Sequence, residues 1–241
     1  MELNVTEAGS GDVLVAFVHG VLDRGRSFAG VADALVSECT MLWWDRRGYG
    51  PAANTPGTMV GIDTHIADVL TVLDGRRAVV VGHSFGGVIA MGVAARAPES
   101  VRAVVAYESS VAWAPGWDDR VMLGVFASED PEAAALRLMF GGRYDEMRGE
   151  ERERRRSDAA VFLAEERSVR QGAPYELAAV RCPVVYGVSD AAVMPAVTGY
   201  LARRLPSVEF VTLPGAGHHA HRTDPEGFAM LVRRAIELSR A

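Results

Sequence analysis

The sequence predicts an α/β fold in which a mostly parallel β-sheet is flanked by helices. Two observations support this prediction. Short apolar runs, typical of strands buried on both faces, alternate with segments of helical periodicity. One run, residues 79–81 (VVV), leads directly into GHSFGG and then into a helical pattern. The 241 residues suffice for one large domain or for one domain with an insertion.

Strands and helices alternate through the first 112 residues. Strands are expected at residues 13–18, 40–44, 78–81 and 101–107, and helices at residues 27–37, 59–73 and 88–97. The alternation stops after Tyr107, and residues 113–179 have a helical pattern without a comparable strand. It resumes with strands at 183–186 and 208–212 and helices at 195–204 and from 225 to the end. The chain is therefore divided into a first core part (1–112), a helical insertion (113–179) and a second core part (180–241).

Composition and charge exclude several classes of protein. The formal net charge of −6 gives no reason to expect nucleic acid or an anionic membrane as a partner. No apolar run approaches the ~20 residues that a membrane-spanning helix needs, and the first residues do not resemble a signal peptide. Cys39 and Cys182 lie outside any CxxC or Cys/His cluster, which disfavours a disulfide or a metal site and fits a reducing cytoplasm. We expect a cytoplasmic protein, a monomer or homo-oligomer, that acts on a small molecule.

Ser84 has the setting of a nucleophile. A tight strand-to-helix turn forces its apex residue into a strained conformation and exposes its side chain. Gly82 and Gly86 leave space where a Cβ atom would clash. The helix N-terminus that follows favours developing negative charge.

A serine hydroxyl needs a neighbouring base. His218 is the candidate, because it follows the last strand in the glycine-rich loop PGAGHHAHR, at the sheet edge where parallel sheets bind ligands. His83 is expected to point away from Ser84, and His19 to brace its own loop. His65 reads as a surface or boundary residue.

Two carboxylates could orient the base. Asp190 and Glu108 each directly follow a strand at the same edge, and we favour Asp190, with Glu108 as the alternative acid. The backbone N–H groups of Val21 and Phe85 are the expected oxyanion donors, from the loop after the first strand and from the residue after the nucleophile.

Together these segments resemble the α/β-hydrolase superfamily over essentially the whole chain. The resemblance rests on FVHGVLDRGRSF, WWDRRGYG, GHSFGG, GVSD and PGAGHHAHRTDPEGF. It implies a mostly parallel eight-stranded sheet, a helical cap formed by residues 113–179, and no cofactor or metal.

The resemblance does not determine the reaction. The simplest chemistry is hydrolysis of a small, mostly apolar carboxylic ester through an acyl-enzyme on Ser84. A C–C bond hydrolase, a lactonase and a cofactor-free haloperoxidase-like esterase would use the same triad. A ligand-binding or sensing module on this fold is the alternative from another class.

Overall fold

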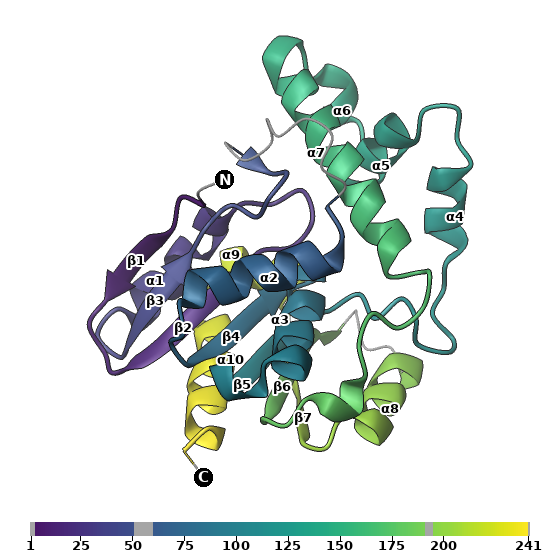
Figure 1. Ribbon diagram of the computed structural model, residues 1–241. Helices are drawn as coiled ribbons and strands as arrows, with labels where there is room; N and C mark the ends of the chain where they lie inside the picture. The colour runs from purple at the N-terminus through teal and green to yellow at the C-terminus, as the bar shows by residue number, and fades with distance from the viewer. Residues whose placement is uncertain (1–2, 51–59, 191–194, 241) are drawn as a thin grey trace.

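A twisted β-sheet forms the centre of the molecule (Figure 1). The computed structural model describes residues 3–50, 60–190 and 195–240. Their strands, in spatial order, are β1 (Thr6–Gly9), β3 (Cys39–Trp43), β2 (Val13–Val18), β4 (Ala78–His83), β5 (Val101–Tyr107), β6 (Val184–Ser189) and β7 (Val208–Leu213). β1 pairs antiparallel with β3, and all other pairs are parallel. The described sheet therefore has seven strands, one fewer than the eight expected.

Helices cover both faces of the sheet. The helices of one face are α1 (Ala29–Leu35) and α10 (Pro225–Leu238), and those of the other are α2 (Ile62–Leu73), α3 (Phe85–Arg96) and α8 (Pro195–Arg204). Successive strand residues point to opposite faces. In β2, Ala16 packs in the core that holds α2 and α3, whereas Phe17 packs in the core of α1 and α10. This two-sided burial explains why the central strands are continuous apolar runs.

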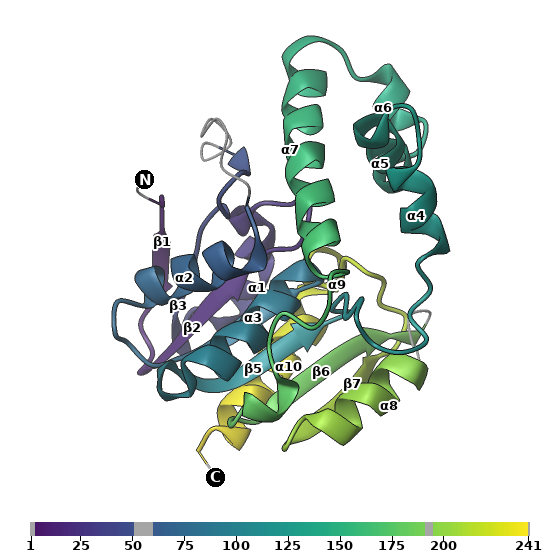
Figure 2. The same cartoon turned by 45° about the vertical axis from the view of Figure 1, so that its right-hand side comes forward.

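The segment between β5 and β6 is helical, as expected. It contains α4 (Arg120–Phe126), α5 (Pro131–Phe140), α6 (Arg143–Glu146), α7 (Gly149–Ser168) and the 3-10 helix η4 (Leu177–Ala179). Figure 2 shows α4 to α7 standing together beyond one end of the sheet, with the C-terminal end of α7 nearest to it. Tyr144, Phe162 and Leu163 belong to a small core of these helices, which also contains Leu22 from the loop after β2. None of the helices in the described ranges is both long and apolar enough to cross a membrane.

The elements expected from sequence agree with the structure, apart from their ends. The expected helix at 59–73 is α2, which begins at Ile62, while Met59 lies outside the described residues. Three 3-10 or short helices, η1 (Gly25–Phe28), η3 (Pro98–Ser100) and α9 (Ala220–Thr223), complete the described elements. Because the strands other than β1 are parallel, the ends of β4, β5 and β6 bring Ser84, Glu108 and Asp190 to one edge of the sheet.

Candidate active site

Ser84 occupies a strained turn between β4 and α3. Its backbone φ of 54° and ψ of −122° lie in a region that non-glycine residues rarely adopt. Its N–H donates to the Tyr107 carbonyl at the end of the neighbouring strand (2.8 Å), and its carbonyl accepts from Gly87 N–H (3.0 Å). The turn is therefore fixed from both sides, and the side chain lies at the N-terminus of α3.

The glycines around Ser84 are required by close backbone contact. A Cβ atom on Gly86 would lie 2.0 Å from the Val18 carbonyl oxygen, and one on Gly82 would lie 2.2 Å from the Gly86 carbonyl. Such distances are far inside van der Waals contact, so a side chain at Gly82 would force β4 and α3 apart and one at Gly86 would force α3 away from β2. The GxSxG spacing therefore reflects packing of the turn against β2 as well as the conformation of the serine.

His218 is held by its backbone above the end of the sheet. Its carbonyl accepts a hydrogen bond from His83 Nε2 (2.7 Å), and the preceding Gly217 carbonyl accepts one from the Tyr107 hydroxyl (3.0 Å). The His218 side chain is 41% exposed. The two contacts explain how a glycine-rich loop can present an imidazole in a defined place that a substrate can still reach.

The carboxylate that contacts His218 is Glu108. Its Oε2 lies 2.6 Å from His218 Nδ1, and its Oε1 accepts the Ser189 N–H at 2.9 Å. Burial alone would raise the pKa of Glu108, but the hydrogen bonds from His218 and Ser189 outweigh burial and lower it. An ionised Glu108 accepts a hydrogen bond from Nδ1–H, so the proton of a neutral imidazole at His218 is on Nδ1 and Nε2 keeps its lone pair.

The expectation that Asp190 contacts His218 is wrong. Asp190 Oδ2 instead accepts the backbone N–H of Gly215 at 2.8 Å. Gly215 begins the histidine loop with a φ of +70°, so Asp190 stabilises the loop that carries His218. In the hydrogen bonding of the described residues, His218 has Glu108 and His83 as partners, and the Ser84 hydroxyl is not one of them.

Arg46 and His19 orient the backbone of the first loop. The Gly20 carbonyl accepts from Arg46 Nη2 (3.0 Å) and from His19 Nδ1 (2.8 Å). His19 Nε2 accepts the Arg46 N–H (2.9 Å), and burial together with Arg46 lowers the His19 pKa to about 3, so this imidazole is neutral. In a trans peptide the N–H points opposite to the carbonyl. The Val21 N–H therefore points away from Arg46, while the Phe85 N–H is one of the unpaired donors at the start of α3.

Three side chains near Ser84 could in principle hold a metal ion. The ligand atoms of Asp23, His83 and His221 lie within 4.8 Å of one another. His221 Nε2 bonds to Asp23 Oδ2 (3.1 Å). Burial raises the pKa of Asp23, but the contacts with His221, His19 and the Arg24 backbone together outweigh burial and lower it. His83 Nε2 is engaged with the His218 carbonyl. These hydrogen bonds join the nucleophile turn, the first loop and the histidine loop.

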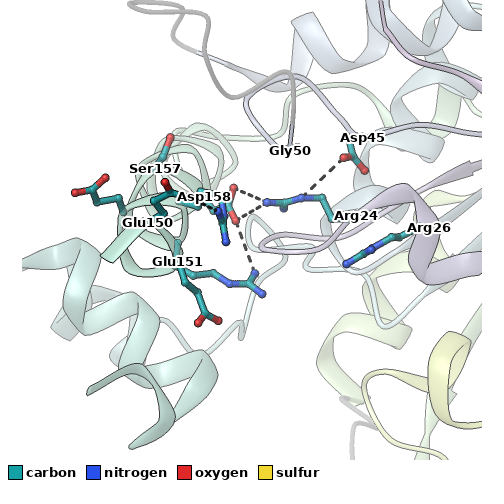
Figure 3. Close-up of a pocket in the computed structure, with 11 residues that line it drawn as sticks. Arg24, Arg26, Asp45, Gly50, Glu150, Glu151, Ser157 and Asp158 are labelled. Atoms are coloured by element: carbon teal, nitrogen blue, oxygen red, sulfur yellow. Dashed lines mark hydrogen bonds and ion pairs between the residues drawn. The ribbon is translucent and has the colours of Figure 1, made fainter. Parts of the chain in front are cut away.

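The cavities near these elements include two of different character. The smaller, about 180 Å³, is lined by Glu108, Ser109, Ser110, Trp117, Tyr186, Val188, Val197, Thr198 and His218. The larger, about 840 Å³, lies between α7 and the first loop and is lined mainly by charged side chains. Figure 3 shows Arg24 crossing it, paired with Asp158 of α7 (2.8 Å) and with Asp45 (3.9 Å). Of these two cavities, the smaller one has His218 and apolar walls among its described lining residues.

Sequence reasoning missed two buried polar residues, His65 and Glu165, that contact each other. His65 is 1% exposed, contrary to the surface or boundary location expected, and its Nε2 lies 2.6 Å from Glu165 Oε1. Glu165, which was not singled out from the sequence, is fully buried and lies near the end of α7. The sequence does contain a signal. Glu165 follows Phe162 at helical spacing, so both residues lie on the buried face of α7.

Glu165 is expected to make stability depend on pH. Burial raises its pKa, but Arg46 and His65 outweigh burial and lower it from 4.5 to about 2. A carboxyl whose pKa is lower in the folded state stabilises the protein above pH 4.5, and this contribution is lost as the pH falls toward 2. One pKa unit corresponds to about 1.4 kcal/mol, so the contribution is about 3 kcal/mol.

Urea unfolding at several pH values between 6 and 3 measures this contribution. The unfolding free energy of the Glu165→Gln variant should fall less steeply over that range than that of the wild type. Equal slopes for the two proteins would contradict the assignment.

The model of the α/β hydrolase family matches residues 15–231. The 2-(acetamidomethylene)succinate hydrolase of Mesorhizobium japonicum is 28% identical over 247 residues, which cover 93% of this chain and 87% of the relative. Lipase LipV of Mycobacterium tuberculosis is 36% identical over 117 residues, or 46% of this chain and 43% of the lipase. A solved thermophilic esterase from Thermogutta terrifontis, with malate bound, superposes with a TM-score of 0.74 at 20% identity, covering 99% of this chain and 94% of the esterase. The family match covers most of the chain, and the seven-stranded sheet and the strand–turn–helix at Ser84 are consistent with it. This chain therefore belongs to the α/β hydrolase family.

Proposed function

We propose that the protein is a serine hydrolase that cleaves a small, neutral, mostly apolar carboxylic ester. Ser84 is the nucleophile, His218 the general base and acid, and Glu108 the carboxylate that orients His218. The observation that carries the proposal is the hydrogen bond between His218 and Glu108 at the sheet edge where Ser84 forms its strained turn.

The proposed reaction follows from the hydrogen bonds of His218. Nδ1 keeps its proton and donates the hydrogen bond that Glu108 accepts, so Nε2 can take the proton of the Ser84 hydroxyl as Oγ attacks the ester carbonyl carbon. The carbonyl oxygen becomes an oxyanion that the N–H groups of Val21 and Phe85 stabilise. The ester C–O bond breaks, and the leaving alcohol takes the proton from His218. Water then attacks the acyl-enzyme by the same path, which releases the acid and restores Ser84.

The proposed substrate class rests on the cavity beside His218. Its volume of about 180 Å³ suits a short acyl or alcohol group, and Trp117, Tyr186, Val188 and Val197 supply apolar walls. Glu108 is the charged side chain among its described lining residues, and none of those is an arginine. A carboxylate in the substrate would be repelled there, so the succinate of the Mesorhizobium japonicum relative is not carried over to this chain.

A panel of p-nitrophenyl esters, lactones, thioesters and vinylogous diketones tests the proposal. We expect p-nitrophenyl acetate and butyrate to be hydrolysed, and p-nitrophenyl hemisuccinate, which carries a carboxylate, at a kcat/KM at least about tenfold lower. A preference for the diketone or the lactone would assign the same site to a different reaction. Turnover of no member of the panel would favour the ligand-binding module.

A further inference from the structure

A buried ion pair connects the helical insertion to the loop that carries Val21. Glu165 of α7 and Arg46, which follows β3, are 0% and 2% exposed and form a direct salt bridge. The Tyr49 hydroxyl donates to Glu165 Oε2 at 2.8 Å, and His65 contacts Oε1. We call Arg46, Tyr49, His65 and Glu165 the buried polar cluster.

The other side of Arg46 contacts the first loop. Its Nε donates to the His19 carbonyl (2.8 Å) and its Nη2 to the Gly20 carbonyl (3.0 Å). Its guanidinium carbon also lies 5.5 Å from the centre of the Phe85 ring. One guanidinium thus touches the peptide group that contains the Val21 N–H and the side chain of Phe85, whose N–H is the second proposed oxyanion donor.

Glu165 is the anion that allows Arg46 to remain there. A buried guanidinium needs a counter-charge and hydrogen-bond acceptors. His65 and His19 are held neutral because burial and Arg46 lower their pKa values. Burial and Glu165 raise the pKa of Tyr49, so its hydroxyl is neutral as well. Among the groups of the buried polar cluster, Glu165 alone balances the charge of Arg46.

We propose that Glu165 is a positioning residue for the oxyanion hole. By fixing the Arg46 guanidinium, it fixes the Gly20–Val21 peptide, so that docking of α7 on the body determines where the Val21 N–H points. The insertion then contributes to the rate of the chemical step as well as to the shape of the site. This inference rests on the proposed function, because it concerns the donors of that reaction.

Glu165→Gln tests the inference because it keeps the shape of the side chain and removes its charge. We expect kcat for p-nitrophenyl butyrate to fall about 10- to 100-fold, somewhat less than for complete loss of an oxyanion donor, with KM changed less than threefold. An alkyl boronic acid, which forms a tetrahedral adduct with a serine nucleophile, should bind more weakly by a similar factor. A purely structural role would alter neither kcat per folded molecule nor the affinity for the boronic acid.

Glu166→Gln is the matched control. Glu166 is the next residue of α7, is 5% exposed, and pairs with Arg170, which in turn pairs with Asp119. These partners belong to the insertion and do not contact the first loop in the described hydrogen bonds. We expect this variant to lose stability but to keep the wild-type kcat and boronic acid affinity.

Tyr49→Phe gives a second test if Glu165→Gln does not fold. It removes one donor to Glu165 and leaves both charges in place, and we expect kcat and boronic acid affinity to fall together by about threefold or more. Wild-type values of both quantities in the folded Glu165→Gln or Tyr49→Phe variant would overturn the inference. A wild-type protein that neither hydrolyses the ester nor binds the boronic acid would instead overturn the proposed function.

Discussion

Replacing Ser84 with alanine is expected to lower kcat for p-nitrophenyl butyrate by about 10⁴-fold or more. The variant keeps the proposed oxyanion donors but lacks the oxygen atom that forms the acyl-enzyme. Only the rate enhancement from substrate binding and the oxyanion donors remains. The turn should survive, because alanine carries the same Cβ atom that serine already places at a φ of 54°.

Steady-state kinetics of the purified variants measures this effect. Ser100→Ala is the control, since Ser100 lies in η3, beyond the far end of α3. Its kcat should equal that of the wild type. Undiminished activity of the Ser84→Ala variant would show that another group performs the hydrolysis.

Exchanging the two carboxylates for amides should have very different effects. Glu108 accepts the Ser189 N–H with one oxygen and His218 Nδ1 with the other. Glutamine has one carbonyl oxygen, no charge and an NH2 group, so it cannot accept both bonds. If the NH2 group faces His218 it favours the wrong tautomer, and if the oxygen does, the negative charge that stabilises the imidazolium is still lost. We expect Glu108→Gln to lower kcat by about 10²- to 10⁴-fold.

Asp190→Asn is the matched comparison, with an expected loss of less than about tenfold. Asparagine retains one oxygen that can accept the Gly215 N–H, the contact that Asp190 makes in the structure. Kinetics of both variants with one ester gives the ratio directly. A larger loss for Asp190→Asn than for Glu108→Gln would restore Asp190 as the working acid.

The strands of the sheet could be predicted because each of the central ones is buried on both faces. Such a strand contains a continuous apolar run, as residues 78–81 of β4 and 103–107 of β5 do. β1 escaped prediction because its sequence TEAG is short and mostly exposed at the sheet edge, so it has no apolar pattern. An exposed edge strand of this kind is held by its pairing with β3, which no local sequence pattern reveals.

The choice between the two acids could not be made from the sequence. Glu108 and Asp190 follow β5 and β6, which are adjacent strands, and adjacent strands lie only ~4.8 Å apart. The glycine-rich loop that carries His218 can span that difference. Which carboxylate His218 meets depends on the tertiary contacts of its loop with Tyr107 and His83.

The buried polar cluster was hidden for a similar reason. Glu165 and His65 are 100 positions apart in the chain, and Glu165 and Arg46 are 119 apart. Each residue alone is typical of an exposed helix or a polar loop. Only the docking of α7 against the body brings these charges together out of water.

Peptide-resolved mass spectrometry after reaction with a fluorophosphonate tests the central claim most directly. Trypsin cuts after Arg77 and Arg96, and the peptide of residues 78–96 contains Ser84 as its single serine and no threonine or tyrosine. We predict one phosphonyl group per chain, carried by this peptide in the wild type and absent from it in the Ser84→Ala variant. A wild-type peptide 78–96 that stays unmodified while the intact protein hydrolyses esters would contradict the account.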